Sequence, residues 1–241
     1  MRNEEVFRRR HLPHWDIPGA TYFVTACLGG SIPAQGLLDL RRYRKQLDAR
    51  PRPAEVSEEE WELRLAKLEF ARVDRWLDDE PAVRHLEREE LATEVRDAFY
   101  HFAGDRYDLL AYVVMPSHVH WVFRPRDEWM AAANPDRRTA RESICHSLKR
   151  HTALQCNGLL RLKGAFWQDE SYDHWLRDVD ELLRCIEYTE NNPVKARLVQ
   201  RPSDWRWSSA YDRALNGTRF GDPLPRPQPN GPAGELGASV P

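Results

Sequence analysis

Residues 107–124 read YDLLAYVVMPSHVHWVFR, and this stretch decides the fold. Two runs rich in β-branched and aromatic residues, 107–115 and 118–124, are separated only by Pro116-Ser117. That spacing predicts a tight hairpin of two adjacent antiparallel strands. Upstream, ATYFVTACL at 20–28 has the same composition and predicts a further strand.

Helical patterns surround these strands. The segment 35–104 predicts a largely helical, acidic insertion, in which Ser57 and Glu60 form a capping box before apolar residues at helical spacing. Thr139 and Glu142 form a second capping box, which predicts a helix to about Cys156 with Asn157-Gly158 as its end.

The last elements complete an alternating order. An extended aromatic segment is expected at 164–175 and a helix at 178–190. Without the insertion, the order β–α–β–β–α–β–α predicts an α+β fold: a ferredoxin/RRM-like antiparallel sheet with helices packed on one face. One domain is expected over 1–220. A disordered tail is expected at 221–241, because residues 222–241 hold six prolines and three glycines.

Composition excludes several classes of protein. The chain has 241 residues, of which 41% are hydrophobic, and no apolar run approaches the roughly 20 residues that span a bilayer. The N-terminus carries four arginines among its first 14 residues and no apolar core of a secretory signal. The four cysteines are far apart and form no CxxC pair, which argues against a zinc knuckle and a disulfide scaffold. A reduced, cytoplasmic protein is expected.

The net charge of −2 conceals a strong asymmetry. Residues 1–52 hold ten basic and five acidic side chains, and residues 137–163 hold seven basic and one acidic. Residues 55–97 hold seven basic and fifteen acidic. The two basic blocks are candidate phosphate-binding surfaces, although solvated helix faces would give the same pattern. The acidic block is expected to point away from a polyanion.

His118 and His120 flank a single valine inside the second strand of the hairpin. Side chains alternate along a strand, so both imidazoles lie on one face, where neutral nitrogens can hold one divalent cation. Paired histidines on a strand surface without a metal are the alternative.

Tyr188 and Asn192 are four residues apart and share a face if the helix continues that far. A tyrosine hydroxyl beside a metal-bound phosphate is a candidate nucleophile, and the amide oxygen of Asn192 a candidate metal ligand. Tyr188 could equally be core packing. Asn192 could equally be the N-cap of a new helix that starts at Pro193 and runs to Val199.

Four motifs occur in order along the chain: MPSHVHWVF, WQDESYDHWLRD, YTENNPVKARLV and DWRWSSA. Together they resemble the single-tyrosine HUH transposases, specifically the REP-associated tyrosine transposase branch, over roughly residues 20–211. The resemblance implies a Mg²⁺ or Mn²⁺ site at His118 and His120 with Asn192 as a further ligand, and Tyr188 as the nucleophile that attacks DNA. The chain departs from the family in its long 35–104 segment and in having Asn where related enzymes often have Gln.

The resemblance implies single-stranded or hairpin DNA as the partner, a 5′-phosphotyrosine intermediate and a homodimer in which the tyrosine helix can be exchanged. Basic and aromatic side chains near the motifs are expected to contact the DNA, the basic ones through phosphates and Trp167, Tyr172 and Trp175 by stacking on bases. The aromatic residues could instead be core, and His174 could orient the site, contact DNA or be buried. The candidate DNA-binding residues are Arg137, Arg138, Arg141, Lys149, Arg150, Trp167, Tyr172 and His174.

Two functions follow from these motifs. The first is a metal-dependent single-strand DNA endonuclease and strand transferase; the second is a non-cleaving DNA-binding regulator of repeat elements derived from a transposase. An RRM-like RNA binder fits less well, because the early strands lack the aromatic RNP pattern. A zinc hydrolase fits less well still, because no third ligand has metalloprotease spacing.

Overall fold

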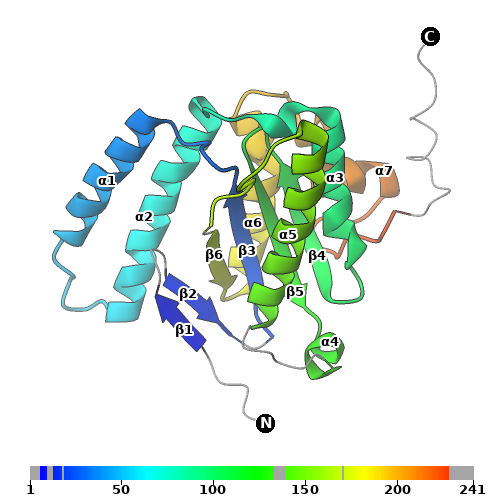
Figure 1. Ribbon diagram of the computed structural model, residues 1–241. Coiled ribbons are helices and arrows are strands. Elements are labelled where there is room, and N and C mark those ends of the chain that lie inside the picture. The colour runs from blue at the N-terminus through cyan, green and yellow to red at the C-terminus, as the bar shows by residue number, and fades with distance from the viewer. Residues whose placement is uncertain (1–5, 10–12, 18, 133–138, 170, 228–241) are drawn as a thin grey trace.

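The computed structural model describes residues 6–9, 13–17, 19–132, 139–169 and 171–227. Within them, four antiparallel strands form a sheet in the order β4-β5-β3-β6 (Figure 1). The strands are β3 (Thr21–Cys27), β4 (Tyr107–Val114), β5 (His118–Pro125) and β6 (Tyr172–Leu176). The hairpin expected at 107–124 is β4–β5, in which Val114 pairs with Val119.

Helices and a small ribbon surround this sheet. Strands β1 (Val6–Arg9) and β2 (Pro13–Asp16) pair with each other. The helices are α1 (Ala34–Asp48), α2 (Glu58–Asp79), α3 (Glu89–His101), α4 (Asp127–Ala132), α5 (Ala140–Leu160), α6 (Val179–Lys195) and α7 (Ser209–Asn216). Two single 3-10 turns lie at His85–Glu87 and Pro202–Asp204. The expected α+β class is confirmed.

Helices cover both faces of the sheet because β5 is buried on both sides. Trp121 and Phe123 belong to the larger core, into which α3 and α5 pack. Val122 points the other way, into a smaller core that Ile186 of α6 completes. In Figure 1, α5 passes in front of the sheet and α6 behind it. The face expected to carry helices is therefore covered by α3 and α5, and α6 adds a layer on the opposite face.

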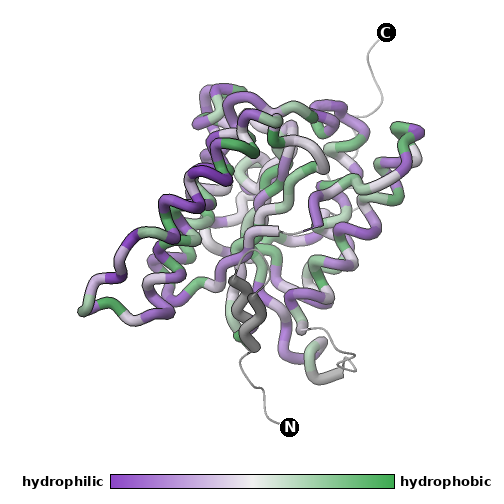
Figure 2. Tube along the Cα trace, turned by 60° about the vertical axis from the view of Figure 1, so that its left-hand side comes forward, coloured by the Kyte–Doolittle hydropathy of each residue, from purple (hydrophilic) through white to green (hydrophobic). Residues whose placement is uncertain are grey.

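The segment 35–104 divides into two parts. Helices α1 and α2 form an antiparallel hairpin whose residues are largely hydrophilic (Figure 2). Helix α3 instead buries Leu91, Val95 and Phe99 against the sheet and α5. Helix α3 is therefore part of the core layers, whereas α2 reaches the core through Phe70 and Leu77. The extent of the insertion stays a prediction.

Helix α6 continues through Pro193 to Lys195, so the alternative in which Asn192 caps a new helix is wrong. The helix ends where Arg197 adopts a left-handed backbone with φ 59°. Tyr188 and Asn192 consequently lie one turn apart on the same helix. Helix α5 likewise passes the expected stop at Asn157-Gly158 and ends before Arg161, which also has positive φ.

The packed chain extends beyond the expected start of the disordered tail. Leu224 is buried in the larger core, and its backbone N–H donates to the carbonyl of Leu109 at 2.8 Å. Arg226 also donates to the carbonyls of Tyr100 and His101, at 3.2 and 2.9 Å. The domain boundary at 221 stays a prediction. The rest of the expected tail, 228–241, lies outside the described residues.

Candidate active site

The side chains of His118 and His120 converge on one point beside β5. His118 and His120 have no solvent exposure, and their Nε2 atoms are 3.1 Å apart. Two nitrogens bound at about 2.1 Å to one ion are roughly 3.0–3.4 Å apart at octahedral to tetrahedral angles. The pair therefore has the spacing of two ligands that share a cation.

In each histidine a hydrogen bond at Nδ1 orients the ring, and Nε2 faces the other histidine. Nδ1 of His120 is 2.6 Å from Oγ1 of Thr25, and Nδ1 of His118 is 3.0 Å from Oγ of Ser117. Because the Ser117 hydroxyl donates to the carbonyl of Leu77 at 3.1 Å, it accepts from His118. In the neutral ring, Nδ1 of His118 then carries the proton, and Nε2 has a lone pair available for a metal. Burial, and next the neighbouring His120, lower the pKa of His118 to about 3, so the ring is a neutral ligand at pH 7.

Helix α6 brings Tyr188 and Asn192 to the histidines. Nδ2 of Asn192 lies 3.2 Å from Nε2 of His120, and the Tyr188 ring centre lies 5.5 Å from that of His120. Asn192 is fully buried, and its Oδ1 has no hydrogen-bond partner in the described part of the chain. The Tyr188 hydroxyl also lacks a partner there. An amide oxygen left without a partner is an available metal ligand.

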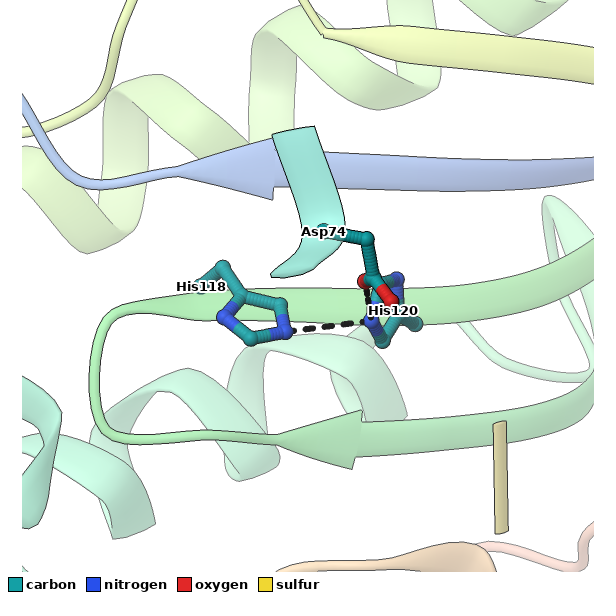
Figure 3. A group of neighbouring side chains, drawn as sticks. All are labelled: Asp74, His118 and His120. Carbon is teal, nitrogen blue, oxygen red and sulfur yellow. Dashed lines mark hydrogen bonds and ion pairs between the residues drawn. The ribbon is translucent and has the colours of Figure 1, made fainter. Parts of the chain in front are cut away.

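Helix α2 contributes two carboxylates that are absent from the site predicted from the sequence. Oδ1 of Asp74 lies 3.5 Å from Nε2 of His120, and Oδ1 of Asp78 lies 3.9 Å from Nε2 of His118. Both carboxylates contact the ammonium of Lys195, which is 2.9 Å from Asp78. Ligand atoms of Asp74, His118 and His120 all lie within 4.8 Å of one another (Figure 3). The D-x-x-x-D spacing, one helical turn, was the available signal for this pair.

The donor set fits a divalent cation. Two imidazoles, one amide oxygen and two carboxylates are donors that Mn²⁺ and Mg²⁺ accept, and Oδ1 of each aspartate has no hydrogen bond among the described groups. Burial, together with Asp74 and Asp78, raises the pKa of the Tyr188 hydroxyl far above its usual value. The tyrosine is therefore protonated at neutral pH in this arrangement.

The basic residues expected to contact phosphate differ in their surroundings. Arg137 and Arg138 lie outside the described residues. Arg141 is buried, with Nε 2.8 Å from Asp16 and Nη1 3.2 Å from Asp173. The predicted phosphate contact at Arg141 is corrected: this guanidinium joins β2 to β6 through two buried carboxylates.

The expected stacking residues are packed against protein. Trp167 is buried, and its Nε1 donates to the hydroxyl of Thr152 at 2.9 Å, which makes it a core residue instead of a base-stacking one. Tyr172 is half-buried, and its ring stacks on Phe70 of α2 with 4.0 Å between centres. Phe70 therefore occupies one face of the Tyr172 ring.

His174, Lys149 and Arg150 complete the predicted set. His174 is buried, and its Nε2 is 2.8 Å from Glu181 at the start of α6, so it positions that helix and the expected DNA contact is corrected. The Lys149 ammonium donates to backbone carbonyls in the segment 168–169. Arg150 is exposed on α5, where a phosphate can reach it.

Comparisons with known proteins give limited similarity. No family model matches the chain, and no curated protein matches it. One similar solved structure is that of a REP-associated tyrosine transposase bound to a REP hairpin, with 19% identity, a TM-score of 0.49, and coverage of 92% of this chain and 93% of that one. None of the described helices combines the length and the apolarity needed to cross a membrane.

Proposed function

We propose that this protein is a metal-dependent single-strand DNA nicking and strand-transfer enzyme in which Tyr188 is the nucleophile. Its substrate is single-stranded or hairpin DNA. His118, His120 and Asn192 hold a Mg²⁺ or Mn²⁺ ion, and Asp74 adds a ligand from α2. The resemblance of the four sequence motifs to tyrosine transposases first suggested this chemistry.

One observation carries the proposal: a tyrosine hydroxyl and an amide oxygen from α6 meet two imidazole nitrogens from β5 in a single buried cluster. Tyr188 is 68 residues from His120 along the chain, so only the fold brings them together. A DNA-binding module without chemistry has no use for a buried hydroxyl without a partner beside a metal-binding pair.

The reaction exchanges one phosphodiester bond for another. Oη of Tyr188 attacks the scissile phosphorus in line, the bond from phosphorus to the 3′ oxygen breaks, and the hydroxyl proton ends on that oxygen. The products are a 5′-phosphotyrosyl link and a free 3′-OH. A bound divalent cation would polarise the phosphate and neutralise charge on its oxygens. A second 3′-OH can then reverse the step on another strand without an external energy source.

The chain offers a limited set of candidates for holding the DNA. Arg150 is the exposed member of the expected phosphate-binding residues within the described chain, and Arg137 and Arg138 remain part of the proposal. Because one tyrosine cuts one strand, a folded single strand is the natural substrate. A homodimer stays a prediction.

The test uses hairpin oligonucleotides with randomised flanks and a label at either the 3′ or the 5′ end. With Mn²⁺, the wild-type protein should retain the 3′ label covalently and release the 5′ label on a fragment with a free 3′-OH. Tyr188→Phe should bind the same DNA and retain no label, whereas the matched control Tyr211→Phe should behave as wild type. DNA binding without any covalent product in the wild type would favour the non-cleaving regulator.

A further inference from the structure

The candidate site is closed in this conformation. His118, His120 and Asn192 have no solvent exposure, and the side chains of Asp74 and Asp78 from α2 are 3% and 5% exposed. A scissile phosphate therefore has no path to the histidines while α2 is in place.

The protein donors alone can nearly fill a cation's coordination shell. Two nitrogens come from β5, one amide oxygen from α6 and two carboxylates from α2. Catalytic metal sites keep at least one coordination position open for substrate, whereas structural metal sites fill every position with protein ligands. The two aspartates are the donors that can leave, because they come from the α1–α2 hairpin, whereas the other donors come from the sheet and α6.

Carboxylate and phosphate oxygens compete for the same positions. Both are anionic oxygen ligands, and two anions cannot share one small buried site without a large electrostatic cost. Lys195 contacts both aspartates from α6. When α2 leaves, this ammonium loses its two counter-ions and becomes free to neutralise a phosphate.

Polar, aromatic and apolar contacts hold α2 against the rest of the molecule, among them the hydrogen bond from the Ser117 hydroxyl to the carbonyl of Leu77, whose side chain packs against Cys27. Lys67 is 2.8 Å from Glu181 of α6, and Phe70 stacks on Tyr172 of β6. Removing Phe70 would uncover the ring face of Tyr172 next to the site. The same movement that exposes the cation thus exposes an aromatic platform for a base.

We propose that α2 is a carboxylate lid: Asp74 and Asp78 complete the cation's shell in the resting protein, and single-stranded DNA must displace them for its phosphate to reach the site. This inference rests on the proposed function. It assigns Asp78 as a metal ligand of the closed state and Lys195 as a group that passes from the carboxylates to the phosphate.

The lid is tested by tethering it. Lys67→Cys and Glu181→Cys, in a Cys185→Ser background, place one thiol on α2 and one on α6 for a short, cleavable bis-thiol cross-linker. The cross-linked protein should bind Mn²⁺ with unchanged affinity and form at least about tenfold less covalent DNA product. Cleaving the linker should restore the product, so each molecule is its own control.

The ligand assignment is tested without activity. Asp78→Asn should lower Mn²⁺ affinity by about tenfold or more, measured from the signal of free Mn²⁺ by electron paramagnetic resonance. Asp79→Asn, a change of equal charge at the exposed neighbouring residue, should leave it unchanged. Equal Mn²⁺ affinities of Asp78→Asn and Asp79→Asn would overturn the assignment of Asp78 as a metal ligand of the closed site.

The outcomes separate the lid from the proposed function. Undiminished DNA cleavage by the tethered protein would overturn the lid and leave the function standing. If the untethered double-cysteine protein and the wild type both form no covalent product, the proposed function fails, and the Mn²⁺ titrations still decide the role of Asp78.

Discussion

Replacing Tyr188 by Phe should stabilise the metal-free protein while abolishing its chemistry. The Tyr188 hydroxyl is buried and has no hydrogen-bond partner among the described residues. Leaving a polar group in this state costs about 1–3 kcal/mol, and Tyr→Phe removes the group with little change in volume. We expect the free energy of unfolding to rise by about 1 kcal/mol and the melting temperature by roughly 2–4 °C in a chain of this size.

The matched control is Tyr107→Phe, at a tyrosine that is also buried but whose hydroxyl donates to the carbonyl of Phe99 at 2.6 Å. This variant should lose about 1 kcal/mol, because it deletes a hydrogen bond and leaves a buried carbonyl without its donor. Thermal unfolding in EDTA at pH 7 measures both. Because burial raises the pKa of both the Tyr188 and the Tyr107 hydroxyl, neither substitution changes the protein's charge at that pH.

The reasoning would be refuted if Tyr188→Phe destabilised the protein as much as Tyr107→Phe does. Its hydroxyl would then have a stabilising partner in the resting state and would not be free to react. Covalent capture of labelled hairpin DNA by the same preparations shows whether the chemistry is lost along with the hydroxyl.

Three further outcomes are expected. His118→Ala and His120→Ala should each abolish Mn²⁺ binding and DNA cleavage and keep the circular dichroism spectrum, whereas His101→Ala, at an exposed residue, should change none of these. Arg141→Ala should cost about 3–5 kcal/mol in chemical denaturation, since it leaves two buried carboxylates unpaired, and wild-type stability would contradict this role. Burial raises the pKa of Glu181, but hydrogen bonds from Lys67 and His174 outweigh it and lower the pKa to about 2. The stabilisation that Glu181 contributes is present above its unfolded pKa of about 4.5 and is lost as the pH falls toward 2. Glu181→Gln should therefore flatten that part of the acid denaturation curve.

The sequence predicted the parts of the site that depend on local periodicity. His118 and His120 share a face because strands alternate, and this needed only a correct strand assignment. Tyr188 and Asn192 share a face because α6 continues, which their spacing alone left undecided. Pro193 suggested a new helix start, and the packing of α6 against the sheet instead keeps one helix through the proline.

The contribution of α2 was not predictable in the same way. Its acidic composition indicated a solvated surface pointing away from a polyanion, and six of the twelve charged residues in α2 are exposed. Asp74 and Asp78 depart from this average because they lie near the C-terminal end of α2, where the hairpin reaches the histidines. Net charge over a segment does not report which two side chains tertiary packing selects.

Three of the candidate DNA-binding residues have protein partners for a related reason. A basic block predicts surface groups, yet Arg141 pairs with two carboxylates that lie more than 30 residues away on either side in sequence. Likewise Trp167 and His174, in an aromatic motif, fill the core and support α6. Motif membership indicates that a segment matters without separating residues that build the site from those that touch the substrate.

Helix α6 itself shows that the unsatisfied groups at the site are not a general property of its polar side chains. Two residues after Tyr188, the buried carboxylate of Glu190 accepts from the hydroxyl of Ser209 at 2.7 Å and from the guanidinium of Arg213 at 2.9 Å. The same helix thus satisfies its polar groups on the side that packs against α7. Within the described chain, the face toward the histidines leaves the Tyr188 hydroxyl and the Asn192 oxygen without partners. Such an arrangement costs stability, which is the expected cost of keeping a nucleophile and a metal ligand available for substrate.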